Sequence, residues 1–363
     1  MSKRICHVTS VHPAFDIRIF HKECATLAQQ YDVTLIAPNV EMHDEKGIHI
    51  VGVPLPNSRL RRQFCLGRVR RAMLRVDAEV YHFHDPELMR LGRYMRRHGK
   101  KVIFDSHEDV PMQILLKLWI PKCLRRPLSA LWRQHEKYNL RHYDAIVSVT
   151  PTIIDRLRTY NPNIYQITNY PRYEAHDDRR EWERSVCFAG GISPRYLNEV
   201  VLQALEGSDI RFRMAGRFEE GYEAHFKGLP GWQQVDYAGV LPADHVREFI
   251  QQSSVGIATL DYIPNVGYRK GSLGVLKFFE YLAAGIPVVA TDFEVWKTVI
   301  DKYHCGICVD PHDMEAVGNA IRYLLDHPDE ARRMGDRGIE AVRQEYSWDA
   351  QALILLDMYR KIL

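Results

Sequence analysis

The chain has 363 residues, 46% hydrophobic and 26% charged, a balance typical of soluble globular proteins. No apolar run approaches the 18 residues of a membrane span, so we expect no membrane-spanning segment, and the N-terminus leads into a strand without a signal-peptide pattern. Seven scattered cysteines and this length predict a cytoplasmic protein of two domains. The net charge of +3 is uneven, because residues 1–170 carry 27 Lys and Arg against 16 Asp and Glu. The first half therefore predicts an anionic partner surface.

Strands and helices alternate along the whole chain. In the first half we predict a helix at 17–30, another at about 87–98, and strands at 5–9, 32–37, 79–84, 101–105 and 144–149. In the second half we predict helices at 197–205, 245–251, 277–284, 314–326 and 328–345, and strands at 185–189, 210–215, 235–237, 255–258, 287–290 and 306–309. This pattern predicts an α/β protein with two doubly wound parallel sheets. The expected domains are 1–170 and 185–346, with a linker at 171–184 and a final helix at 347–363.

The turn after the first strand carries His12, Asp16 and Arg18 at the usual position of a ligand. It lacks the glycines of a dinucleotide-binding fingerprint, which disfavours a dehydrogenase. The three side chains either contact a ligand, or Asp16 caps the helix and pairs with Arg18.

Two further strand ends in the first half carry histidines and carboxylates. They read His82-Phe-His84-Asp85-Pro-Glu87 and Asp105-Ser-His107-Glu108-Asp109. Carboxyl ends of parallel strands share one edge of a sheet, so this edge is predicted to handle a polar ligand or acid–base chemistry. Metal-ligand spacing such as H-E-x-x-H does not occur there, and metal is the weaker interpretation. Helix capping by Asp85 and Asp109 is the structural alternative.

Glycine-rich loops mark the second half. Gly190-Gly191-Ile-Ser-Pro-Arg195 follows a strand, and the loop 264–274, with Lys270, leads into the helix that carries Lys277 and Glu280. Backbone amides and cations at a helix N-terminus favour anions, so these loops predict a diphosphate site without a metal. Lys277 and Glu280 lie one turn apart on a helix that is otherwise built to pack, where a charge is costly unless it meets a polar group.

The order of these motifs resembles family 4 retaining glycosyltransferases of the GT-B fold over nearly the whole chain. The most specific part is Lys277-x-x-Glu280-Tyr-x-Ala-Ala-Gly285-x-Pro287-Val-Val, supported by Ala215-Gly216-Arg217 and Ala238-Gly239-Val240. The segments His12-Pro-Ala-Phe-Asp16-x-Arg18, His84-Asp-Pro-Glu87-Leu and Asp105-x-His107-Glu108 are similar to a branch often found in bacterial surface-polysaccharide synthesis.

The resemblance implies a role for each matching residue. Glu280 would bind the ribose, Arg195 the diphosphate with Lys277 or Lys270, and Gly239 and Val240 the base. His107 would approach the reacting centre, and the final helix would cross back onto the first domain.

Two positions depart from the family pattern. Ser272 stands where the family has a first carboxylate, and Gly191 stands where it has an arginine. The donor sugar is therefore left open, and Lys270 or Arg18 would supply the missing cation.

The predicted function is a metal-independent, retaining sugar transfer from a nucleoside diphosphate donor, without a cofactor, in surface-polysaccharide synthesis. The expected acceptor is a glycan or a lipid-diphosphate-linked glycan. An epimerase or hydrolase of the same architecture, or a binding protein without catalysis, are the alternatives.

The basic first half is predicted to contact the inner face of an anionic membrane rather than nucleic acid, since the arginine-rich stretch has no regular aromatic spacing. The apolar and basic stretch 111–133 is either an interfacial helix pair or a core or oligomer contact.

Overall fold

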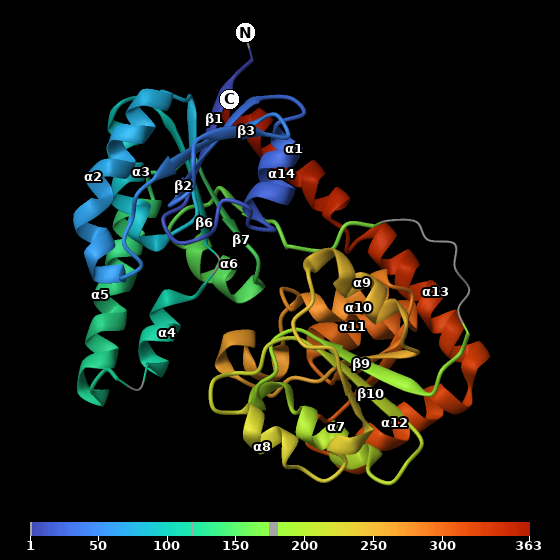
Figure 1. Cartoon of the computed structure of the whole chain (residues 1–363). Helices are drawn as coiled ribbons and strands as arrows, with labels where there is room; N and C mark the ends of the chain where they lie inside the picture. Colours follow the sequence, from blue (N-terminus) through green and yellow to red (C-terminus); the bar gives the residue numbers. More distant parts are fainter. Residues whose placement is uncertain (1, 107, 118, 174–180) are drawn as a thin grey trace. The chain divides into compact units, whose positions relative to one another are not determined.

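The computed structural model describes residues 2–106, 108–117, 119–173 and 181–363. It divides into two compact units, Met1–Asn169 with Gln351–Leu363, and Tyr170–Ala350 (Figure 1). The linker expected at 171–184 lies partly outside the described residues. Among the described residues, no helix has both the length and the apolar character that a membrane crossing requires.

Unit 1 is built on an eight-stranded sheet of order β3-β4-β2-β1-β5-β6-β7-β8, in which only β3 runs antiparallel to its neighbour. Its strands are β1 Arg4–Val8, β2 Asp32–Pro38, β3 His43–Glu45, β4 Ile48–Val53, β5 Val80–Phe83, β6 Lys101–Ser106, β7 Ala145–Ser148 and β8 Ile164–Gln166. Its helices are α1 Ala25–Leu27, α2 Arg59–Val76, α3 Met89–Arg97, α4 Val110–Leu116, α5 Lys122–Leu140, α6 Pro151–Arg158 and most of α14 Trp348–Ile362. Apolar side chains of α2, α3 and α5 pack on one face of this sheet.

Unit 2 has a six-stranded parallel sheet of order β11-β10-β9-β12-β13-β14. Its strands are β9 Ser185–Ala189, β10 Arg211–Ala215, β11 Val235–Tyr237, β12 Val255–Ala258, β13 Val288–Thr291 and β14 Gly306–Val309. Its helices are α7 Asn198–Leu205, α8 Glu223–Lys227, α9 Ala243–Gln251, α10 Leu276–Ala283, α11 Glu294–Tyr303, α12 Met314–Asp326 and α13 Pro328–Gln344. One face packs against α7, α8 and α12 and the other against α9, α10, α11 and α13, as Figure 1 shows, so two layers of helices enclose the sheet.

The structure confirms two doubly wound sheets, and most predicted strands agree with it to within one or two residues. The helix predicted at 17–30 is wrong in form. A π-helical turn, Ile19–Cys24, comes first, with the Glu23 N–H donating to the Arg18 carbonyl, and α1 ends at Leu27. The cause is Asp16, whose Oδ1 accepts the N–H groups of Arg18 and Ile19 at 2.9 Å and starts the helix late.

Candidate functional site

In each unit the strand order reverses at the first strand, which creates a crevice where adjacent loops diverge. In unit 1, β1 lies between β2 and β5, and in unit 2, β9 lies between β10 and β12. The loops that follow β9 and β12 are tied together, because the Asp261 N–H donates to the Arg195 carbonyl at 2.8 Å and the Thr259 hydroxyl to the Tyr196 carbonyl at 2.7 Å. The predicted Gly-rich loops therefore lie at the switch point of unit 2.

Glycine backbone builds the floor of this crevice. Gly190 and Gly216 have φ of +132° and +140°, and a Cβ on Gly216 would fall 1.8 Å from the Gly190 carbonyl oxygen. The Gly190 N–H donates to Ala215, and the Gly216 N–H donates to the Gly239 carbonyl at 2.7 Å. The loops after β9 and β10 thus approach so closely that only glycine fits at Gly216.

Lys277, in the first turn of α10, extends over this floor. A Cβ on Gly190 would meet its Nζ at 2.5 Å, and Nζ lies 4.1 Å from the centre of the Tyr196 ring. The neighbouring Arg195 is half exposed, with Nε donating to the Ser193 hydroxyl at 3.0 Å and a terminal nitrogen 3.6 Å from Glu219. Two cations and the start of a helix therefore surround the glycine loop, which is the chemistry that a diphosphate requires.

The remaining donor-side candidates surround the same helix. Glu280 is half-buried one turn beyond Lys277, and the hydroxyl oxygen of the next residue, Tyr281, accepts the Ala189 N–H at the end of β9 at 3.1 Å. Ser272 is buried, and its hydroxyl accepts the Gly274 N–H at 3.0 Å, so the structure uses it to form the turn that enters α10.

Four further donor-side candidates remain. Lys270 is exposed at the end of the turn Tyr268–Lys270. Gly239 has a φ of +73°, and Val240 beside it is 61% exposed. Gly191 has no neighbour within 4 Å of the position of a Cβ. These residues leave an open surface beside the glycine floor.

A hydrogen-bonded carboxylate organises the crevice of unit 1. Asp85 follows β5, and its Oδ2 accepts the Thr9 hydroxyl at 2.8 Å and the Ser10 N–H at 2.6 Å from the loop after β1. Its Oδ1 lies 3.6 Å from His12 Nε2. Asp85 is thus not a helix cap but a link between the two loops. A cavity of about 240 Å³ opens here, and its wall includes four of the predicted residues, namely His12, His84, Asp85 and Glu108.

The charge of His12 in this cavity is affected by neighbouring carboxylates. Its Nδ1 lies 3.5 Å from Asp16 Oδ2. The hydrogen bond to Asp16 raises the pKa of His12, against the lowering effect of burial, and Asp85 raises it further. Burial raises the pKa of Asp16, but the bonds from His12 and from the Ile19 N–H outweigh this and hold that pKa below its ordinary value. The pair therefore favours an imidazolium beside a carboxylate.

Arg18 does not have the predicted role of contacting a ligand or pairing with Asp16. Its side chain is 5% exposed, its Nε lies 2.9 Å from Asp105 and 3.0 Å from Glu23, and NH1 donates to the Ile167 carbonyl. The reason is steric and electrostatic, because two fully buried carboxylates beneath the crevice require a counter-charge. Burial raises the pKa of Glu23, and Arg18 opposes that rise.

Sequence reasoning named His82 and His84 but missed His7 and Tyr359, which lie with them beside this ion cluster. His7 Nδ1 lies 2.9 Å from His84 Nε2, and the hydroxyl of Tyr359 on α14 lies 2.9 Å from His82 Nδ1 and 3.2 Å from His7 Nε2. The sequence did contain two signals of this cluster: His7 is a histidine and Glu23 an acid within otherwise apolar elements. His107, the predicted catalytic residue, lies outside the described residues.

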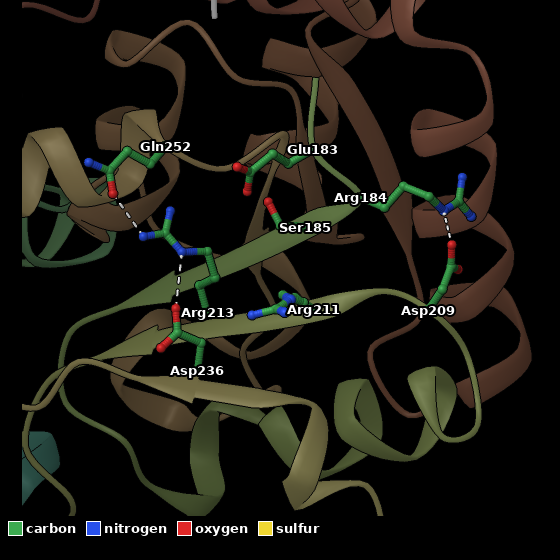
Figure 2. A pocket seen from close by; sticks show the side chains of 8 residues that line it. All are labelled: Glu183, Arg184, Ser185, Asp209, Arg211, Arg213, Asp236 and Gln252. Atoms are coloured by element: carbon green, nitrogen blue, oxygen red, sulfur yellow. Dashed lines mark hydrogen bonds and ion pairs between the residues drawn. The ribbon is translucent and has the colours of Figure 1, made fainter. Parts of the chain in front are cut away.

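A separate cavity of about 530 Å³ lies at the opposite, amino-terminal edge of the unit 2 sheet (Figure 2). Its arginines face carboxylates, since Arg184 lies 2.8 Å from Asp209 and Arg213 lies 3.5 Å from Asp236. Ligands of open α/β sheets bind at the carboxyl ends of the strands, so this cavity is not the candidate site.

Comparison with known proteins identifies related enzymes. A family model described as "Glycosyltransferase Family 4" matches residues 18–169, and one described as "Glycosyl transferase-like" matches residues 195–357. The chain belongs to glycosyltransferase family 4. This glycosyltransferase is 27% identical over 338 residues to the phosphatidyl-myo-inositol mannosyltransferase of Mycobacterium leprae, covering 86% of the chain and 82% of the relative. It is 24% identical to the D-rhamnosyltransferase WbpZ of Pseudomonas aeruginosa, over 76% and 71% of the two chains.

Solved structures show the same fold. Sucrose-phosphate synthase from Thermosynechococcus elongatus has a TM-score of 0.73 at 16% identity and covers 99% of this glycosyltransferase and 98% of its own chain. WaaG, a glycosyltransferase involved in lipopolysaccharide biosynthesis, has a TM-score of 0.69 at 12% identity, over 98% and 99%. Anabaena HepE in complex with UDP and glucose has a TM-score of 0.70 at 9% identity, over 99% and 100%. The fold is GT-B, as the resemblance implied.

Proposed function

We propose that this glycosyltransferase moves a sugar, with retention of configuration and without a metal, from a nucleoside diphosphate sugar bound by unit 2 to an acceptor bound by unit 1. The observation that carries the donor assignment is the ammonium of Lys277 directly above Gly190, with Glu280 one turn further along α10. Relatives described as GDP-mannose-dependent mannosyltransferases and the UDP complex of HepE support a nucleoside diphosphate donor.

The chemistry of transfer follows from where charge develops. As the bond between the sugar and the diphosphate breaks, negative charge grows on the leaving phosphate oxygen. Lys277, Arg195 and the N-terminus of α10 would stabilise that charge, and they hold their geometry before the reaction begins. Glu280 would accept hydrogen bonds from the ribose hydroxyls and fix the nucleotide along the helix. The imidazolium that His12 favours beside Asp16 would orient a polar acceptor in the cavity of unit 1.

Calorimetric titration with nucleoside diphosphates and their sugars tests the donor assignment and identifies the base. We expect one of UDP or GDP to bind, and Glu280→Gln and Lys277→Met to weaken that binding. If neither variant changes the Kd, the donor site is elsewhere. Turnover in excess EDTA tests metal independence, and NMR of the anomeric centre of the product tests retention. Formation of a new isomer, or of free sugar at the same rate without any acceptor, would instead favour an epimerase or a hydrolase.

We propose further that the enzyme works at the inner face of a bacterial membrane in surface-polysaccharide synthesis. A cavity of about 480 Å³ on unit 1 is lined by arginines of α2 and α3 together with two tyrosines, namely Arg70, Arg90, Arg93, Arg97, Tyr94 and Tyr138. Arginine and tyrosine together suit the anionic interface of a bilayer. The description of WaaG as a glycosyltransferase involved in lipopolysaccharide biosynthesis supports the pathway. Sedimentation with anionic vesicles at low salt should remove the protein from solution, and neutral vesicles should not.

A further inference from the structure

The helical hairpin of unit 1 contains an apolar groove that the transfer reaction described above does not use. Helices α4 and α5 pack against each other, and beside them lies a cavity of about 880 Å³. Most of its wall is large and apolar, namely Val110, Ile114, Trp119, Ile120, Leu128, Leu131 and Trp132. A drug-sized cavity with such a wall is suited to an apolar body.

Several of these side chains are exposed although they are bulky and apolar. Trp119 is 78% exposed and Leu131 is 66% exposed, with Leu128 beside them at 41%. Lys117 places its Nζ 5.7 Å from the Trp119 ring centre, at the same groove. Single exposed apolar residues are ordinary, but a contiguous set that lines one cavity marks a binding surface.

The groove shares a wall with the polar cavity that carries His12 and Asp85. Pro86, Glu87 and Val110 line both cavities. A ligand can therefore place a polar head at the carboxyl ends of β5 and β6 and a hydrocarbon part between α4 and α5.

The charges in the groove favour an anion between these two parts. Arg90 and Lys117 line it, and Glu87, a carboxylate among its described lining residues, is paired with Arg62 at 2.8 Å. The groove therefore carries an excess of positive charge at the side of its apolar wall, which matches a phosphate joined to a hydrocarbon chain.

We propose that this groove binds the hydrocarbon chain of the acceptor, and that the acceptor is an amphiphile whose hydroxyl-bearing head is joined to that chain through phosphate. This proposal rests on the proposed function, because it names the acceptor class for the cavity of unit 1. The head occupies the polar cavity, the phosphate meets Arg90 and Lys117, and the chain lies against Trp119, Leu128 and Leu131.

Binding of n-alkyl phosphates tests the groove without any transfer. Calorimetry with n-butyl, n-octyl and n-dodecyl phosphate, each below its critical micelle concentration, should give tighter binding as the chain lengthens. Burial of one methylene contributes about 0.8 kcal/mol, or roughly a fourfold change in Kd, so butyl and octyl phosphate should differ by roughly 200-fold when all four additional methylenes are buried. Equal Kd values along the series would overturn the proposal.

A matched pair of variants separates the groove from general adsorption. Leu131→Gln on α5, made together with Leu128→Gln, should abolish the dependence on chain length. Leu353→Gln on α14 removes a leucine that is equally exposed, at 70%, and should leave the dependence intact. If both changes reduce alkyl phosphate binding alike, the binding is adsorption and the groove is not a site.

Donor binding and transfer provide the last comparison. If the double variant binds UDP or GDP like the wild type but loses turnover only with long-chain acceptors, the proposal holds. If no acceptor is glycosylated while the Kd of alkyl phosphates still depends on chain length, the proposed transfer function is wrong and the groove remains a binding site for phosphate-linked chains. If the double variant retains chain-length dependence and loses only vesicle binding, the groove is a bilayer contact and the proposal is overturned.

Discussion

Replacement of Gly190 by alanine tests whether the Lys277 ammonium belongs to the diphosphate site. A Cβ at this position would lie 2.5 Å from both Cε and Nζ of Lys277. Carbon atoms in contact are about 3.5–4.0 Å apart, so the end of the lysine side chain must move by about 1 Å or more. The backbone itself would stay, because the obstructing atoms are the far end of a flexible chain. Gly190→Ala should therefore displace the ammonium of Lys277 while Lys277 itself stays in the chain.

Two magnitudes follow from this geometry. A charge-assisted hydrogen bond to phosphate contributes about 1.5–3 kcal/mol, so both Gly190→Ala and Lys277→Met should weaken binding of the nucleoside diphosphate by roughly 10–150-fold. Because Gly190 has a φ of +132°, the alanine variant should also have its free energy of unfolding lowered by about 1–3 kcal/mol. Lys277→Met has no such cost.

Calorimetry on a double-mutant cycle decides the matter. Because both changes remove the same interaction, the double variant should bind the nucleotide with about the same Kd as whichever single variant binds it less tightly. Gly207→Ala is the control for strain alone, since Gly207 has a φ of +73° and no atom within 4 Å of its Cβ position. It should lose stability and keep its Kd. Multiplicative losses in the double variant would refute the reasoning and assign separate roles to the two positions.

Three further predictions concern the charged groups. Glu280→Gln should weaken nucleotide binding by about tenfold and abolish the preference for ribose over 2′-deoxyribose, measured by calorimetry. Asp16→Asn should return the pKa of His12 toward its ordinary 6.5, as followed by NMR titration. Because the pKa of His12 is raised in the folded state, protonation of His12 stabilises the fold below pH 6.5, and this stabilisation is lost as the pH rises through the pKa of the folded state. Urea unfolding should show this loss in the wild type and not in Asp16→Asn. Arg18→Met should cost about 3–5 kcal/mol in urea unfolding of unit 1 by leaving Asp105 without its partner, while nucleotide binding persists; an unchanged midpoint would contradict the ion-pair assignment.

The elements that could be predicted from sequence are those whose pattern is local. Strands such as β6 and β13 are short apolar runs bounded by polar or turn residues, because a parallel strand is covered on both faces. By contrast, seven of the 18 residues of α2 are arginines and the helix has no clear apolar stripe, and β4 contains His49 and Gly52 within a mixed pattern. Their structure depends on tertiary packing, which a local pattern does not contain.

The residues of the candidate site also divide into those that a local pattern predicts and those that depend on tertiary contacts. Gly190 and Lys277 were predicted because glycine loops and helix termini bind anions for local reasons, and the structure brings them together across 87 positions of sequence. Arg18 was misassigned because its nearest acid in sequence, Asp16, uses its carboxylate to cap the backbone. Its actual partner, Asp105, lies 87 positions away in sequence. The two residues come together only through the pairing of β1, β5 and β6.

The buried charges of unit 1 are best explained by what they hold in place. Burying Glu23 and Asp105 with one arginine costs more solvation than the ion pairs recover in most proteins, so stability alone is a weak reason for such a cluster. Yet the arginine also donates to the Ile167 carbonyl, and Asp105 lies at the end of β6, directly beneath the polar cavity. A hydrogen-bonded network in a low-dielectric interior is rigid. The cluster therefore fixes the loops that carry His12 and Asp85, and a cavity held in place in this way would suit the proposed acceptor site.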